Sequence, residues 1–240
     1  MKNASEHAKK LRGLLRKAKA GPEPGVELPS PIEVLVYAYL LWETTTKQAD
    51  ASYLRLMRQV VDMNDLRVTD TGDLVEMLGD RVSMAEERVL MMRRGLNAVY
   101  LSEHAMNLAR VSEMGKRDAR AYMEGLDGVP RFVSGYVLLH AFGVHAMPVD
   151  ENLLGRLERD GVVAEGTTIE EAQSFLEHQV KAAEGERVAG QLRGYSESGG
   201  GRVTKKTTKK KTTRKKTTKK KTTKKKTTKK KTTKKKTKRS

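Results

Sequence analysis

The chain has 240 residues, of which 48 are Lys or Arg and 30 are Asp or Glu, and it contains no cysteine. The lack of cysteine excludes disulfides, cysteine nucleophiles, thiolate zinc sites and iron–sulfur clusters. The net charge of +18 is unevenly spread: residues 202–240 hold 23 basic and no acidic residues, which leaves 25 basic against 30 acidic residues in 1–201. The sequence therefore indicates a mildly acidic body followed by a strongly basic tail.

Residues 5–19 predict a basic amphipathic helix. Three leucines, Leu11, Leu14 and Leu15, fall on one face among lysines and arginines. Such a helix either docks on the body or lies on a membrane surface, and the short apolar stripe favours docking. A connector rich in Pro and Gly follows at 21–31 and cannot continue the helix.

The rest of the body predicts further helices and no strands. Pro31 suits a helix start, and the segment 32–42 is apolar nearly all round, so we expect it in the middle of the fold. Residues 70–73 are expected to break the chain. The other predicted helices are 49–61, 74–78 (closed by Gly79), 84–100, 101–110, 115–125, 133–142 and 168–182. The pattern indicates an all-α fold.

No segment has the length of a membrane span. The longest apolar run, 34–42, has nine residues, and the N-terminus lacks the apolar core of a signal peptide. We therefore expect a soluble intracellular protein.

The most informative segment is 123–157, which contains a helix, a short turn and a second helix. The first helix ends near Leu126 and the second begins near Arg131, with Gly128 in the turn, where the missing side chain lets the backbone approach a partner closely. The amides that open the second helix point outward, where a phosphate oxygen can accept from them. This is a helix-hairpin-helix, although on spacing alone a purely structural hairpin is the better interpretation.

The same segment resembles the signature of the endonuclease III-like (HhH-GPD) superfamily of DNA glycosylases: a hairpin L-x-G-V-G, an apolar helix, then Val-Asp and another helix. The matching residues are Leu126, Gly128, Val129, the helix 133–142, Val149 and Asp150. The resemblance extends over about 5–195. It implies a two-lobed helical domain, 1–195, with a hairpin lobe at about 31–143 and a second lobe from 1–30 and 144–195, and it implies a DNA-binding protein of base-excision repair.

The resemblance assigns Asp150 to the family's essential aspartate. In the family this residue helps to activate the attacking nucleophile and stabilises positive charge on the sugar as the base leaves. A carboxylate suits both roles, because an anion near a developing cation lowers the energy of the transition state. Taken alone, an aspartate at a helix start would be an N-cap.

Phe132 occupies the position of the lysine with which bifunctional members form a Schiff base. Because phenylalanine cannot form one, the resemblance implies a glycosylase without AP-lyase activity. Two other departures weaken the match: Pro130 replaces the second hairpin glycine and removes an amide donor, and Glu43 puts a carboxylate where relatives often place a glutamine against the DNA. The residues implied to contact the DNA backbone are Leu126, Gly128, Val129, Pro130 and Arg131.

No cofactor is expected. The family's iron–sulfur cluster is excluded by the lack of cysteine, and its hairpin can hold a monovalent cation through backbone carbonyls. His140 and His145 are five residues apart and fall on different helix faces, so they predict no metal site. Tyr37, Tyr39 and Trp42 lie either near the expected base pocket or in the core, and core packing explains them at least as well.

Residues 196–240 predict a disordered tail with a hinge at 196–201. A KKKTT repeat runs over 209–233, and no apolar residue follows Val203. A flexible polycation binds duplex phosphates by releasing counterions, and without aromatic residues it cannot stack on bases; an anionic membrane surface is the less favoured partner. The tail resembles the Lys-rich ends of linker-histone-like proteins. The expected DNA contacts include Lys209, Lys210, Lys211, Lys219, Lys220 and Lys221.

Two functions remain open. The first is a monofunctional DNA N-glycosylase that acts on a damaged or mismatched base, with Asp150 as its catalytic carboxylate. The second is a catalytically inactive DNA-binding or chromatin-associated protein with the same fold. In both, we expect a monomer that binds double-stranded DNA, with no membrane partner, in the cytoplasm and associated with the nucleoid or chromatin.

Overall fold

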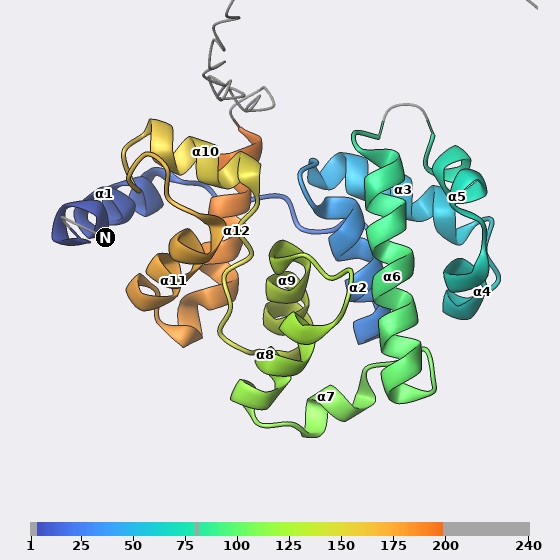
Figure 1. Ribbon diagram of the computed structural model, residues 1–240. Helices are drawn as coiled ribbons and strands as arrows, with labels where there is room; N and C mark the ends of the chain where they lie inside the picture. The colour runs from blue at the N-terminus through green and yellow to red at the C-terminus, as the bar shows by residue number, and fades with distance from the viewer. Residues whose placement is uncertain (1–3, 80–81, 199–240) are drawn as a thin grey trace, which may run out of the picture. The chain divides into compact units, whose positions relative to one another are not determined.

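The computed structural model describes residues 4–79 and 82–198, and these residues form twelve α-helices, one 3-10 helix and no strand (Figure 1). The predicted all-α class is confirmed. None of the described helices combines the length and the apolar character that a membrane crossing requires. The predicted tail contacts, Lys209–Lys211 and Lys219–Lys221 among them, lie outside the described residues.

The first lobe is contiguous in sequence and is built around α2 (Pro31–Leu41). A capping box at Ser30 and Glu33 starts this helix, and nine of its eleven residues are buried, so the apolar segment lies in the middle of the fold as predicted. It packs mainly on α3 (Thr46–Met57) and α9 (Arg131–Phe142). The lobe's other helices are α4 (Met63–Val68), α5 (Thr71–Leu78), α6 (Ala85–Glu103), α7 (Ala109–Glu113) and α8 (Lys116–Gly125).

The second lobe joins the two ends of the described chain. Its helices are α1 (Ala4–Lys17), α10 (Glu151–Arg159), α11 (Ile169–Gln179) and α12 (Gly185–Glu197), and a 3-10 turn (Ala182–Glu184) precedes α12. Leu11 of α1 is 1% exposed and belongs to a hydrophobic cluster with residues of 147–192. The predicted 5–19 helix is therefore docked on the body. In Figure 1, α9 lies between the two groups of helices, and Leu139 of α9 joins the cluster of the second lobe.

Polar and close backbone contacts hold α1 and the connector on α12. The Gln191 side chain donates from Nε2 to the carbonyl oxygens of Leu15 (3.2 Å) and Ala18 (3.1 Å), where α1 ends. Gly21 lies so close to α12 that a Cβ added there would be 2.6 Å from the backbone nitrogen of Gly194. Because only glycine leaves room for this approach, the connector is held tightly along α12.

Some predicted boundaries are wrong. Ser196 and Glu197, assigned to the tail's hinge, are the last residues of α12, because Glu197 accepts hydrogen bonds from Arg193 Nε (2.6 Å) and from the Thr46 amide (2.8 Å). The predicted helix 101–110 is interrupted: residues 101–103 are the end of α6, His104 ends that helix with a left-handed φ of 54°, and residues 109–110 open α7.

Two short helices were misjudged for a local reason. Residues 70–73 do not break the chain; Asp70 caps α5 by accepting from the Gly72 amide at 2.8 Å, so the helix begins at Thr71. The predicted helix 49–61 already ends at Met57, and α4, which was not predicted, begins after its N-cap Asp62. In both cases the aspartate starts a helix.

Candidate functional site

The hairpin between α8 and α9 is seated directly on α6. Gly128 has a φ of 76°, and a Cβ there would lie 2.5 Å from Arg94 Cβ and 2.9 Å from the Gly95 nitrogen. The Tyr39 hydroxyl donates to the Gly128 carbonyl oxygen at 2.8 Å. The close approach expected at Gly128 is therefore made to the protein's own helix α6, and Tyr39 is a core residue that holds the hairpin.

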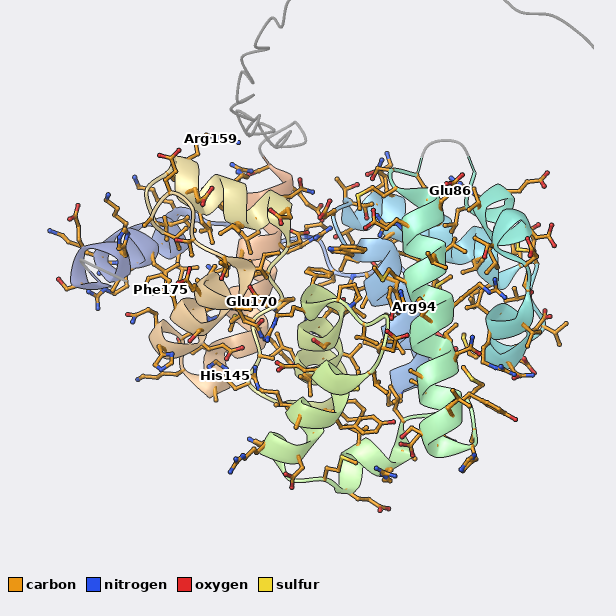
Figure 2. The ribbon with its side chains drawn as sticks, in the orientation of Figure 1. Glu86, Arg94, His145, Arg159, Glu170 and Phe175 are labelled. Atoms are coloured by element: carbon orange, nitrogen blue, oxygen red, sulfur yellow. The ribbon has the colours of Figure 1, made fainter. Side chains whose placement is uncertain are left out.

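Carboxylates contact the basic side chains in and beside the hairpin. Arg131 lies 3.2 Å from Glu170 and 3.6 Å from Glu124, and Arg94 makes two hydrogen bonds to Asp127, at 2.8 and 3.1 Å. Figure 2 labels Arg94 at the middle of α6 and Glu170 on α11. Pro130 is the N-cap of α9 and no side chain caps the helix. Arg131 of the hairpin and Arg94 of the helix beneath it therefore already have acidic partners.

A cavity of about 600 Å³ lies between α2, α9, α10, α12 and the connector. It brings together the two residues that the sequence motif singled out for chemistry, Asp150 and Phe132. The side chains that line it include those of Asp150, Phe132, Tyr37, Tyr136, His140 and Arg193. Of the described residues that line it, none is a lysine.

Asp150 is both a helix cap and a cavity carboxylate. It is 2% exposed and precedes α10, where its Oδ1 accepts from the Leu153 amide at 2.8 Å. Its Oδ2 accepts from the Glu43 amide at 3.2 Å and lies 3.6 Å from an Arg193 nitrogen. Glu43 has a left-handed φ of 54°, which turns its backbone N–H toward Asp150. Asp150 can be both an N-cap and a cavity carboxylate, because its Oδ1 caps α10 and its Oδ2 faces Arg193.

Arg193 connects the second lobe to the end of α2 and was not predicted from the sequence. Besides Asp150 and Glu197, it contacts the Leu41 carbonyl oxygen at 3.3 Å and that of Thr44. Glu197 in turn accepts from the Thr46 hydroxyl at 2.7 Å. The guanidinium therefore lies between two carboxylates and holds α12 against the first lobe.

Replacing Arg193 with methionine is expected to lower the free energy of unfolding by about 3 kcal/mol, because it leaves two carboxylates buried without their cation. The Asp150 and Glu197 side chains are only 2% and 16% exposed. The matched control is Arg187→Met, which removes an ion pair with Glu184 whose side chains are 59% and 47% exposed, and should cost less than about 1 kcal/mol. Urea denaturation measures both, and equal losses would contradict the structural role of Arg193.

Aromatic side chains form one wall of the cavity. Phe132, Tyr136 and His140 follow one another at four-residue intervals on α9, with ring centroids 6.1 Å and 4.3 Å apart, and the Tyr37 ring lies 6.3 Å from that of Tyr136. Burial raises the pKa of Tyr136 to about 12. Burial, with a hydrogen bond to Asp50, also raises the pKa of Tyr37. Both phenols are therefore neutral at physiological pH, and the wall suits a planar aromatic ligand.

Neither Trp42 nor His145 lines the cavity. Trp42 is partly buried, with Arg88 5.9 Å from its ring, and it packs against the core of the first lobe. His140 is in α9, whereas His145 lies beyond the end of that helix, with its Nε2 3.0 Å from the Glu177 carbonyl oxygen. Among residues 4–79 and 82–198, no group of His, Asp and Glu side chains is arranged to hold a metal ion.

Neither a protein-family profile nor a curated protein sequence matches the chain. Solved structures do match: endonuclease III in a non-covalent complex with DNA superposes with a TM-score of 0.61 at 17% identity, over 80% of this chain and 85% of that one. The chain has the helix-hairpin-helix DNA glycosylase fold. The predicted fold is thus confirmed.

Two further glycosylase structures superpose on the chain. The H. pylori 3-methyladenine DNA glycosylase MagIII, bound to 1,N6-ethenoadenine, gives a TM-score of 0.58 at 16% identity, over 81% of this chain and 97% of that one. A thermostable thymine-DNA glycosylase gives 0.56 at 14% identity, over 80% and 85%. At such low identity the likeness establishes the glycosylase fold alone, so the roles of individual residues depend on the geometry of the cavity.

Proposed function

We propose that this protein is a DNA-binding enzyme of base-excision repair that hydrolyses the bond between a base and its sugar. The observation that carries the proposal is the position of Asp150: a buried carboxylate that lines a cavity beside an aromatic wall, on the glycosylase fold. A nucleotide turned out of the duplex would place its base against the rings of α9 and its sugar near Asp150.

The reaction that Asp150 supports needs no covalent intermediate with the protein. As the base leaves with the electron pair of the glycosidic bond, positive charge develops on the sugar, and a fixed carboxylate stabilises it. Water then bonds to the sugar carbon, and its proton passes to Asp150 or to solvent. The hydrogen bonds from the Leu153 and Glu43 amides keep the carboxylate in one orientation for both steps.

The proposed enzyme lacks AP-lyase activity. Phe132, 5% exposed, lines the cavity where a bifunctional enzyme would need an amine, and none of the described lining residues is a lysine. Borohydride reduction in the presence of a substrate duplex is therefore expected to leave no protein–DNA adduct on denaturing gels. A bifunctional glycosylase on the same duplex is the positive control, and an adduct with this protein would contradict the role given to Phe132.

Two observations favour the alternative of an inactive DNA-binding protein. The Arg193 guanidinium, 3.6 Å from Asp150, offsets the negative charge that a sugar cation requires. Pro130, which removes an amide donor from the hairpin, points the same way. We favour the enzyme because Asp150 lines the cavity and the amides of Leu153 and Glu43 hold its carboxylate in place.

Excision assays separate the two functions. The duplexes should each carry one altered base, and the names of the matching structures suggest the first four: 3-methyladenine, ethenoadenine, 8-oxoguanine and mismatched thymine. Release of a base, detected as strand breakage only after hot alkali, would support the glycosylase. Tight binding to every duplex with release from none would establish the inactive protein instead.

Other predictions from the sequence are kept as part of the proposal. These are the monomeric state, the cytoplasmic location with nucleoid or chromatin association, a monovalent cation at the hairpin, and duplex binding by the Lys/Thr tail. The residues of the hairpin expected on the DNA backbone are Leu126, Gly128, Val129, Pro130 and Arg131.

A further inference from the structure

The first helix and the residues just after it carry a high density of positive charge, whereas the rest of the body is acidic in sum. Residues 4–20 contain six Lys or Arg and one Glu, whereas residues 21–201 contain 18 Lys or Arg and 29 Asp or Glu. Since residues 21–201 sum to a net charge of −11, a duplex is attracted to the body most strongly along α1.

The fold leaves the charged side of α1 open and buries its apolar side. Lys9, Arg12 and Arg16 are exposed and, at spacings of three and four residues, share one face of the helix. Leu11 is buried, and Leu14 and Leu15 pack against the same cluster. With its leucines occupied, α1 offers a partner charge without an apolar face, which suits a polyanion and does not suit insertion into a lipid bilayer.

The basic residues of α1 border a second hollow that adjoins the cavity. Lys10, Lys17 and Lys19 line a second hollow of about 700 Å³ between α1 and the end of α12. Ala20 and Pro22 line both this hollow and the cavity that contains Asp150. On the outer side of the same lobe, Arg159 of α10 points away from the fold and adds another exposed basic side chain (Figure 2).

The position of α1 relative to the cavity is fixed by its contacts. Gln191 bonds the carbonyls at the end of α1, and the Gly21–Gly194 approach holds the connector on α12. From the same helix, Arg193 reaches Asp150. A polyanion bound along α1 is thus held in a set geometry to the candidate catalytic carboxylate.

We propose that the basic face of α1, together with Lys19 two residues beyond its end, is a second duplex-binding surface, in addition to the hairpin. This α1 surface consists of Lys9, Lys10, Arg12, Arg16, Lys17 and Lys19. It contacts the phosphates of the DNA that flanks the nucleotide in the cavity, and it reads no sequence, because it presents only charges. The inference rests on the proposed function in one respect: the same duplex occupies the cavity and α1.

Lysine labelling of the full-length protein tests each contact separately. An amine-reactive reagent is applied with and without a 20-base-pair duplex, and the labelled peptides are quantified by mass spectrometry, so that lysines of the tail are counted apart from those of the body. We expect the duplex to protect Lys9, Lys10, Lys17 and Lys19 by roughly threefold or more at low salt, with protection lost at high salt. The exposed lysines Lys47 and Lys116 of the first lobe are the controls. Labelling of the α1 lysines that is unchanged by DNA would overturn the proposal.

A charge-neutralised variant gives an independent measurement. Arg12→Gln, Arg16→Gln and Lys19→Gln together should reduce the slope of log K against log salt by about 2–3, at about 0.9 per lost phosphate contact. The matched control neutralises three exposed residues of the first lobe, Arg58, Lys116 and Arg117, and should leave the slope within about 1 of the parent value. Circular dichroism melts verify that both variants are folded. Equal slopes for the two variants would overturn the proposal.

The outcomes also distinguish the partner and the function. If vesicles with phosphatidylserine protect the α1 lysines and the duplex does not, the surface binds lipid headgroups and the proposal is wrong. Protection by the duplex without excision of any base would overturn the glycosylase function and support the α1 surface. Excision of a base with unprotected α1 lysines would support the glycosylase function and overturn the α1 surface.

Discussion

Replacing Asp150 with asparagine is expected to slow base excision by about 10²–10³-fold, because the variant loses the negative charge that stabilises the sugar cation. The substitution should leave the fold largely intact. Asparagine is as good an N-cap as aspartate, so its side-chain oxygen can still accept from the Leu153 amide. DNA binding should be retained, since one negative charge is removed from the cavity. Single-turnover excision and a binding titration on the same duplex measure the two effects.

Asp62→Asn provides a matched control for this experiment. Asp62 caps α4 in the same way, by accepting from the amide three residues on, Asp65, at 2.7 Å. It tests the cost of changing an aspartate cap without touching the cavity. If Asp150→Asn excises a base as fast as the parent protein and as Asp62→Asn, the carboxylate has no role in the reaction and Asp150 is a helix cap alone.

Replacing Gly128 with alanine is expected to lower the free energy of unfolding by about 3–5 kcal/mol. About 1–2 kcal/mol of this comes from the positive φ, which alanine adopts with strain, and the remainder from forcing a methyl group into the backbone of α6. The nearest atoms, Arg94 Cβ, the Gly95 nitrogen and the Met91 carbonyl oxygen, lie at 2.5, 2.9 and 2.9 Å and belong to the helix itself, so they cannot swing aside. The hairpin would have to lift, and the hydrogen bond from Tyr39 would lengthen.

Gly143→Ala separates the two contributions. Gly143 ends α9 with a φ of 59°, and a Cβ there would meet nothing within 4 Å. Its replacement should therefore cost only the strain of the backbone, about 1–2 kcal/mol. Denaturant unfolding with equal m-values compares the two variants. A loss at Gly128 no larger than that at Gly143 would mean that the hairpin is free to move on α6.

Local signals in the sequence identify several helices, although the local aspartate caps of α4 and α5 were missed. Pro31 and the apolar run after it identify α2, and the Gly128 turn identifies the hairpin. The boundaries fail where distant residues decide them: the last turn of α12 is extended by contacts of Glu197 with Thr46, 151 residues away. No periodicity within 185–201 contains that information.

The residues of the candidate site also differ in whether the sequence alone reveals them. Asp150 and Phe132 could be found from the motif, and the spacing of Tyr136 and His140 from Phe132, at four and eight residues, is a local signal that a search for an aromatic helix face would have detected. Arg193 could not be found, because its role arises only when α12 packs beside α2. The hydrogen bond from the Glu43 backbone N–H to Asp150 could not be predicted either, because it depends on the left-handed backbone of Glu43.

The second lobe joins the first and last helices of the described chain, and this has a consequence for how the protein is made. On the ribosome α1 emerges before the other described helices, but its packing partners, in 147–192, are among the last of the described residues to be synthesised. At a translation rate of about 5–20 residues per second, roughly 10–40 s pass between the synthesis of the α1 leucines and that of their packing partners. The contiguous first lobe can fold during this time. The second lobe closes only after the body is translated, so a ribosome that stalls within α12 leaves a formed hairpin and no enclosed cavity.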